Sequence, residues 1–231
     1  MTGTLGRFLE LSLPTTDIQA SLAFYRALGF TELPTGDVRD YHYAVVSDGR
    51  IAIGLHGGGP RETALSFVLA DVATRVQALV AGGIEPDFSR LGTEHFNEAG
   101  LRDPAGHLLW LLEAPTFSPS LASAPPTAAG QAVAIALPGG GEAQRRFWLE
   151  QGFVDDDAPV GLLRLLAPGL VLEFDPRSRG PELRLRGADP DALGAAVERA
   201  GVTARRAGER LLLHSPEGLL LVIGDAGPTA P

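Results

Sequence analysis

The sequence of this chain repeats itself at about half of its length. The first copy begins with LELSLPTTDIQASLAFYRALGF over residues 9–30, and the second begins with VAIALPGGGEAQRRFWLEQGF over 133–153. The copies also end alike, with RDPAGHLLWLLE over 102–113 and HSPEGLLLVIGD over 214–225. A repeat of this length predicts two related units in tandem, so each copy has to be assessed for the chemistry it retains.

Composition removes several classes of function. The chain has 231 residues, of which 45% are hydrophobic, and its net charge is -9. The negative charge argues against a nucleic-acid footprint, and the absence of cysteine excludes disulfides, thiolate nucleophiles and Cys-ligated metals. All 19 basic residues are arginine, which excludes Schiff-base chemistry on a lysine. No segment resembles a membrane span or a signal peptide, so we expect a cytoplasmic protein with a small-molecule partner and no membrane partner.

Within the first copy a strand, a helix and three strands occur twice in succession. Asp17 and Asp71 precede the two helical patterns, where a carboxylate can cap free amides. The expected strands are 7–13, 30–34, 41–47, 50–56, 64–70, 85–90, 95–102 and 107–113, and the expected helices are 17–28 and 71–81.

The second copy follows the same order with shorter strands. We expect strands at 131–137, 162–166, 170–174, 182–186, 203–207, 210–214 and 219–223, and helices at 142–151 and 190–199. The Pro-, Ser- and Ala-rich segment between the copies predicts a linker. The predicted boundaries are a first domain over 1–115, a linker over 116–129, a second domain over 130–226 and a tail over 227–231.

Four βαβββ modules in two pairs, with a DPxGH turn before the last strand of a pair, resemble the vicinal oxygen chelate superfamily. This superfamily contains glyoxalases, bleomycin-resistance proteins and extradiol dioxygenases. The resemblance implies an α+β fold of two tandem domains, in which paired modules curl mixed sheets into cups with the helices outside. It also implies metal ligands on the concave strands of enzymatic members, and these have to be checked position by position.

Most of the implied ligand positions hold residues that cannot bind a metal. In the first copy they are Glu10, Gly54, Leu65 and Trp110, and in the second they are Ala134, Glu173, Leu183 and Val222. Only Glu10 and Glu173 carry a donor, which falls short of the three protein ligands that a catalytic divalent site usually has. We therefore expect no cofactor, with a weakly held divalent metal as the alternative.

His56 is the one residue that complicates this expectation. It lies two residues beyond Gly54, so strand alternation places it on the same face. Glu10 and His56 could act as an acid–base couple or, with Glu173, as a weak metal site. The other interpretation is that His56 merely begins the HGGGP loop.

Alternation also predicts what lines the first cup. Phe8, Glu10 and Ser12 should share its face, together with Phe67 and Trp110, while Leu9 should face a helix. With His56, these residues form the predicted ligand-binding set, an apolar and aromatic lining around one buried carboxylate. Such a lining suits a flat hydrophobic compound, and it equally suits a cup whose interior is filled.

Three functions remain open from the sequence. The favoured one is metal-independent binding of a hydrophobic or aromatic compound, for sequestration or sensing. The second is a lyase, isomerase or dioxygenase whose catalytic candidates are Glu10 and His56, and the third is a structural or interaction protein with closed cups. Pairing of the two copies within one chain replaces the need for a homodimer, although further association stays open.

Overall fold

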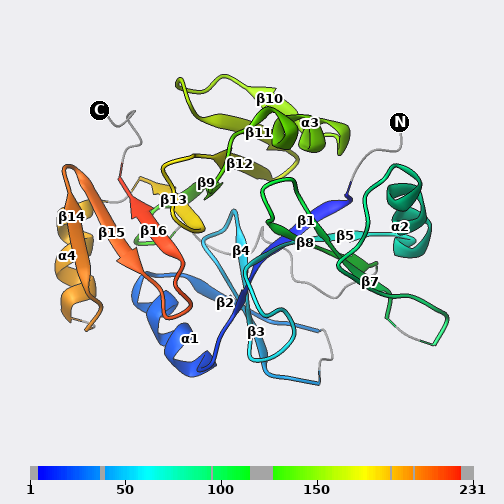
Figure 1. Ribbon diagram of the computed structural model, residues 1–231. Helices are drawn as coiled ribbons and strands as arrows, with labels where there is room; N and C mark the ends of the chain where they lie inside the picture. Colours follow the sequence, from blue (N-terminus) through cyan, green and yellow to red (C-terminus); the bar gives the residue numbers. More distant parts are fainter. Residues whose placement is uncertain are drawn as a thin grey trace.

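The computed structural model describes residues 5–36, 40–94, 96–114, 127–187, 189–199 and 201–224. Two separate sheets of eight strands each dominate it, one from each half of the chain (Figure 1). The expected linker is outside the described residues from 116 to 126, and so is the tail over 227–231. None of the helices in the described ranges combines the length and the apolar character needed to cross a bilayer.

The first sheet is built from two modules that meet at its centre. Its order is β2-β3-β4-β1-β5-β8-β7-β6, so the opening strands of the two modules, β1 and β5, are adjacent and antiparallel. In chain order the elements are β1 (Arg7–Pro14), α1 (Ile18–Ala27), β2 (Thr31–Leu33), β3 (Tyr43–Ser47), β4 (Ala52–His56), β5 (Ala64–Leu69), α2 (Val72–Ala81), β6 (Phe88–Arg90), β7 (Glu98–Arg102) and β8 (Leu108–Glu113).

The second sheet repeats this topology strand for strand. Its order is β10-β11-β12-β9-β13-β16-β15-β14, with β9 and β13 adjacent at the centre. The elements are β9 (Gln131–Leu137), α3 (Glu142–Glu150), β10 (Val154–Asp156), β11 (Leu163–Ala167), β12 (Leu170–Phe174), β13 (Glu182–Arg186), α4 (Pro190–Arg199), β14 (Ala204–Ala207), β15 (Arg210–His214) and β16 (Leu220–Ile223).

The duplicated α+β architecture expected from the repeat is confirmed. The Asp17 carboxylate accepts hydrogen bonds from the amides of Gln19 and Ala20 at 3.0 Å, and thereby caps α1 as the pattern predicted. Strand β10 was not expected, because it lies in a run of three aspartates whose intrinsic strand propensity is poor. Its pairing with β11 makes it a strand.

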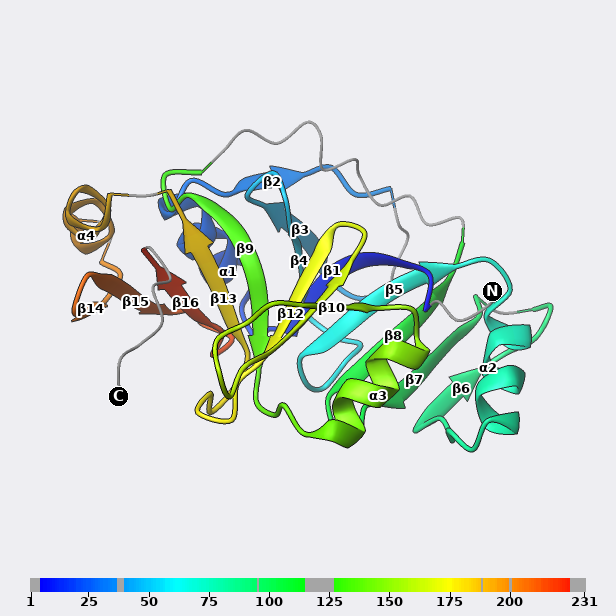
Figure 2. The same cartoon turned by 90° about the horizontal axis from the view of Figure 1, so that it is seen from above.

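The helices connect the two halves of the chain. Trp148 of α3 contacts Phe67 of β5, with ring centroids 6.5 Å apart, so α3 packs against the first sheet (Figure 2). In the opposite direction, the hydroxyl of Tyr25 on α1 donates to Glu217, in the turn between β15 and β16, at 3.5 Å. One continuous hydrophobic core therefore runs through both halves.

Asp103 is the main polar connection in this core. Its side chain is buried, and one carboxylate oxygen accepts hydrogen bonds from Gln144 at 2.6 Å and from the indole of Trp148 at 3.1 Å. The other oxygen accepts from the amides of Ala105 and His107 at 2.9 Å and so shapes the DPAG turn. The turn that precedes β8 is thereby fixed to α3 of the other half.

Asp48 makes a second connection of the same kind. It is fully buried and accepts hydrogen bonds from the amides of Arg50 and Ile51 in its own turn. Its other oxygen accepts from the amide of Ala132 on β9. Residues 127–129, at the end of the predicted linker, also contact the first half of the chain, because the amide of Ala129 donates to the carbonyl of Leu28 at 3.2 Å.

We expect Asp103→Ala to lower the free energy of unfolding by about 2–4 kcal/mol, because it leaves the buried Trp148 indole and Gln144 amide without an acceptor. Denaturant unfolding of the whole chain measures this. Asp157→Ala is the matched control, since Asp157 is exposed and its side chain has no partner in the described ranges. Equal unfolding midpoints for the two variants would contradict the role assigned to Asp103.

Candidate functional site

The strand register shows which side chains line the concave face of the first sheet. Glu10 pairs with Ser66, and Ser66 pairs with Trp110, so these three project from the same face. Gly54 pairs with Ser12 and belongs to this face too. We call this face the first cup.

A β-bulge changes the face of the residues before Glu10. The pairing of β1 with β5 is irregular between Phe8 and Glu10. Leu9 consequently joins Trp110 in the apolar cluster of the cup, whereas Phe8 joins the main core on the opposite face. The expectation that Phe8 lines the cup and Leu9 faces a helix was therefore wrong.

Strand β5 is also one residue out of the expected register. Phe67 packs against Phe8, with ring centroids 5.7 Å apart, and against Trp148 of α3. It therefore belongs to the main core. Leu65 belongs to the same core. The cup face of β5 is formed instead by Ala64, Ser66 and Val68, none of which is a metal ligand of the usual kind.

Glu10 sits at the centre of the cup with both carboxylate oxygens occupied. Oε1 accepts a hydrogen bond from the Ser12 hydroxyl at 2.9 Å and lies 2.9 Å from Nε2 of His56. Oε2 accepts from the hydroxyl of Tyr43 at 2.6 Å. A Cβ atom at Gly54 would lie only 2.2 Å from Oε1, so glycine at this position makes room for the carboxylate.

The partners of Glu10 reverse the effect of its burial. Burial alone would raise the pKa of this fully enclosed carboxyl group. The hydrogen bond and charge of His56, followed by the hydroxyls of Tyr43 and Ser12, outweigh burial and hold the pKa of Glu10 below its usual value. Glu10 is thus an ionised group inside the protein, stabilised by the protein's own side chains.

His56 continues the network towards the rim of the cup. Its side chain is buried, and its Nδ1 atom lies 3.1 Å from the hydroxyl of Tyr41. Since an ionised carboxylate can only accept, Nε2 of His56 donates to Glu10, and Nδ1 is left to form the hydrogen bond with the Tyr41 hydroxyl. The rings of Tyr43 and Trp110 flank the imidazole at 4.8 and 5.6 Å. His56 is consequently part of the cup and not only the start of a loop.

An open cavity of about 350 Å³ lies in the outer half of this cup. Trp110 and Leu108 of β8 and the ring of Phe88 on β6 line it. The Phe88 ring covers Gly100, where a Cβ atom would lie 2.1 Å from the ring. Phe88 itself is 42% exposed. The indole of Trp110 is held by a hydrogen bond of 3.0 Å to Glu98. The cavity thus offers aromatic surface in a fixed orientation.

Three of the charged side chains around this cavity are paired with one another. The Arg102 guanidinium donates to Glu62 and to Asp87, each at 2.6 Å. The hydrogen bond from Arg102 holds the pKa of Glu62 below its usual range. Arg61 also lines the cavity and is exposed, and within the described ranges it forms no hydrogen bond or ion pair.

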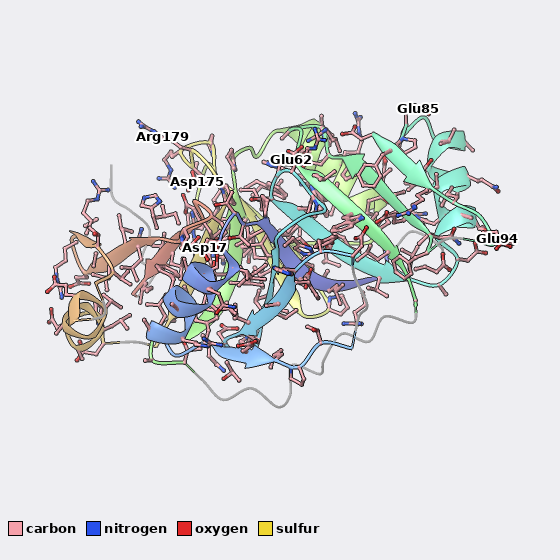
Figure 3. The ribbon with its side chains drawn as sticks, turned by 90° about the horizontal axis from the view of Figure 1, so that it is seen from below. Asp17, Glu62, Glu85, Glu94, Asp175 and Arg179 are labelled. Atoms are coloured by element: carbon pink, nitrogen blue, oxygen red, sulfur yellow. The ribbon has the colours of Figure 1, made fainter. Side chains whose placement is uncertain are left out.

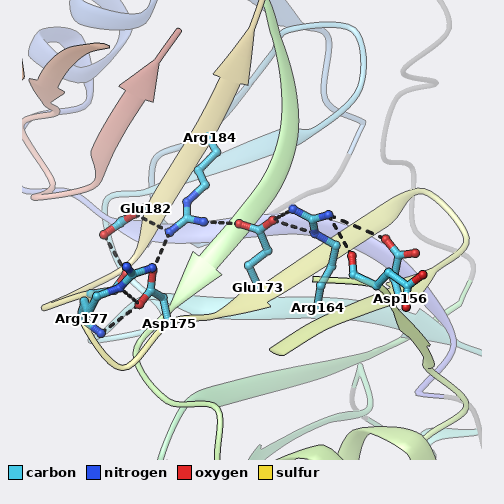
Figure 4. Close-up of polar contacts among 9 residues, drawn as sticks. Asp156, Arg164, Glu173, Asp175, Arg177, Glu182 and Arg184 are labelled. Carbon is cyan, nitrogen blue, oxygen red and sulfur yellow. Dashed lines mark hydrogen bonds and ion pairs between the residues drawn. The ribbon is translucent and has the colours of Figure 1, made fainter. Parts of the chain in front are cut away.

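The concave face of the second sheet, the second cup, holds a chain of ion pairs, whereas the first cup surrounds its carboxylate with hydroxyls and an imidazole (Figure 4). Glu173 is buried and accepts hydrogen bonds from Arg164, at 2.8 Å from its Nε, and from Arg184. Arg184 also donates to Asp175 at 3.3 Å. Mainly through its hydrogen bond from Arg177, the pKa of Asp175 falls to about 2.

These donor sets do not fit a catalytic metal. Glu10 and His56 come together as predicted, but Glu173 lies in the other sheet, and its carboxylate is neutralised by two arginines. The described part of the chain contains no group of three or more His, Asp or Glu side chains able to hold a metal ion.

Some residues of the two cups are not among those predicted from the sequence. Tyr41 and Tyr43 face the first cup, where their hydroxyls contact His56 and Glu10. Arg164 and Arg184 were not recognised, although Arg164 is the single polar residue of β11 and Arg184 alternates with leucines in β13, which is the signal of a polar cup face. His95 is outside the described ranges.

We expect Glu10→Gln to lower the free energy of unfolding by about 2 kcal/mol near pH 7, because the neutral amide interacts more weakly with its donors. A lowered native pKa stabilises the fold above the unfolded value, and this contribution disappears as the pH falls below 4.5, the ordinary value of the group. The difference between variant and wild type should therefore narrow in acid. Urea unfolding across this range checks it, with the exposed Glu85 (Figure 3) changed to Gln as control. A difference that stays constant with pH would be inconsistent with an ionised Glu10.

Comparison with known proteins agrees with this architecture. Residues 7–111 match the family model of the Glyoxalase/Bleomycin resistance protein/Dioxygenase superfamily. No curated protein matches the chain. Among solved structures, a catechol 2,3-dioxygenase shares 17% identity at a TM-score of 0.60, with 99% of this chain and 90% of that one covered.

Two further solved structures are similar over most of their length. The 2,3-dioxygenase LapB from Pseudomonas sp. KL28 shares 16% identity at a TM-score of 0.61, covering 100% of this chain and 96% of that one. A Mn(II)-bound glyoxalase from Novosphingobium aromaticivorans shares 13% identity at 0.59, covering 94% and 80%. At such identities the likeness shows the fold alone. By its family match and its fold, the first half of this chain is a domain of the glyoxalase, bleomycin-resistance and dioxygenase superfamily.

Proposed function

We propose that this protein binds a small, planar, largely uncharged aromatic compound in the first cup, without a metal. The observation that carries the proposal is the cavity of about 350 Å³ lined by Trp110, Leu108 and Phe88. Aromatic walls are typical of small-molecule sites, and offset stacking or edge contacts favour a ring as the ligand.

The geometry of Glu10 supports binding over metal chemistry. All the hydrogen bonds of its carboxylate go to side chains of the protein, so the inner half of the cup is a closed polar network. A ligand in the outer half would meet Trp110 first and Glu10 only through the His56 ring behind it. The network then serves to hold Trp110 and the side chains around Glu10 in fixed positions.

The dioxygenase and glyoxalase names of the structural relatives favour a metal-dependent enzyme as the second candidate. In this chain that activity would have to use Glu10 and His56 as its protein donors. The closed-cup alternative is disfavoured by the open cavity beside Trp110.

Purified protein incubated with Mn²⁺, Fe²⁺ or Zn²⁺ and then desalted should retain far less than one metal ion per chain, because two protein donors hold divalent ions weakly. Elemental analysis by mass spectrometry measures the content. Retention of one equivalent by wild type and its loss in the Glu10→Ala, His56→Ala double variant would support the enzyme instead.

Catechol and 2-naphthol are suitable probes for the aromatic site. They should raise the melting temperature and quench the fluorescence of Trp110, because a ligand that binds only the folded state stabilises it by mass action. The second tryptophan, Trp148, is fully buried between the halves, so Trp110→Phe should abolish the quenching while retaining the Trp148 signal.

Phe88→Ala should weaken the binding of 2-naphthol roughly tenfold, since it removes one aromatic wall. Phe96→Ala is its matched control, because Phe96 is 51% exposed and does not line the cavity. Absence of any thermal shift with either probe, or equal losses in the two variants, would count against the proposed site.

A further inference from the structure

The concave face of the second sheet, the second cup, is unusually rich in arginine for a chain of net charge -9. It contains a hollow of about 170 Å³ and a larger groove of about 1340 Å³, which meet at Arg177. Six arginines line the two spaces against three carboxylates. The arginines are Arg164, Arg177, Arg179, Arg184, Arg205 and Arg210, and the carboxylates are Glu173, Asp175 and Glu182.

The inner arginines are committed to the carboxylates of the cup. Arg164 and Arg184 both bind Glu173, and Arg184 extends to Asp175 and Glu182 (Figure 4). Arg177 closes the chain of ion pairs by contacting Asp175 at 2.9 Å. These contacts neutralise the buried charges and set the positions of the three carboxylates, so little of that negative charge is left to act on the groove.

The outer arginines of the groove are different. Within the described ranges, neither Arg179 nor Arg205 forms a hydrogen bond or an ion pair, and both are exposed. Arg179 extends outward from the loop that carries Asp175 (Figure 3). The chain has 28 acidic residues for its 19 basic ones, so an unpaired arginine is not explained by a shortage of partners.

Aliphatic side chains line the same groove. Leu212 of β15, the register partner of Arg205, and Leu220 of β16 come from neighbouring strands, and the small side chains of Ala20, Ala23 and Ala27 come from one face of α1. The groove thus combines guanidinium groups, which bind carboxylates and phosphates in a bidentate manner, with a smooth apolar surface long enough for a short chain.

We propose that this groove of the second cup binds an organic anion with a short aliphatic body. The anionic head group, a carboxylate or a phosphate, is held by Arg179 and Arg205, and the aliphatic part lies along Leu212, Leu220 and the alanines of α1. This site is separate from the aromatic cavity of the first cup, where Arg102 is paired with Glu62 and Asp87.

Calorimetric titration of the whole protein with octanoate and octyl phosphate tests the proposal, with 1-octanol as the uncharged analogue. Both anions should bind and 1-octanol should not, and the tighter of the two anions identifies the preferred head group. Raising the salt from about 20 mM to about 300 mM should weaken binding, because exposed arginines are screened.

The Arg179→Gln, Arg205→Gln double variant should bind the better anion at least about tenfold more weakly. Arg206→Gln is the matched control, since Arg206 neighbours Arg205 in sequence but pairs with Asp191 and does not line the groove. Trp110→Phe should leave octanoate binding unchanged. Equal affinity for 1-octanol, or undiminished binding by the double variant, would overturn the proposal.

Discussion

Each cup of this protein has to accommodate a carboxylate buried on its inner face, and the way in which that charge is satisfied determines what the cup can do. Glu10 is satisfied by hydroxyls and an imidazole, which leaves a network without arginine beside an aromatic cavity. Glu173 is satisfied by two guanidinium groups, and these extend into a chain of ion pairs. A buried carboxylate without such partners would cost several kcal/mol, so neither network is optional.

The concave faces of the two sheets therefore differ in polarity, whereas their strand order is the same. The order of the eight strands is identical in the two sheets, and both place a carboxylate on the inner face. The substitutions that separate the two cups are on that inner face, where Val45 of β3, which pairs with Gly54, corresponds to Arg164 of β11, which pairs with Glu173. Such changes leave the core on the opposite face untouched, which is why they are compatible with one fold.

The sequence allowed the modules, the helix caps and the pairing of Glu10 with His56 to be predicted, because these follow from local periodicity and capping. The bulge at Leu9 could not be foreseen, since Phe8 and Leu9 are both apolar and either can occupy a buried face. Strand β10 forms only because β11 supplies its hydrogen bonds. The use of Arg164 and Arg184 depends on strands from two modules meeting, which no local pattern encodes.

The packing of Trp148 against Phe67 has a consequence for biosynthesis. When the first half has left the ribosome, one face of β5 still lacks its cover, because α3 lies about 75 residues further along the chain. The nascent chain must keep this apolar face from aggregating until residues 142–150 emerge. Helix α3 of the second half covers the apolar face of β5, so the first half completes its packing only after the second half has been synthesised.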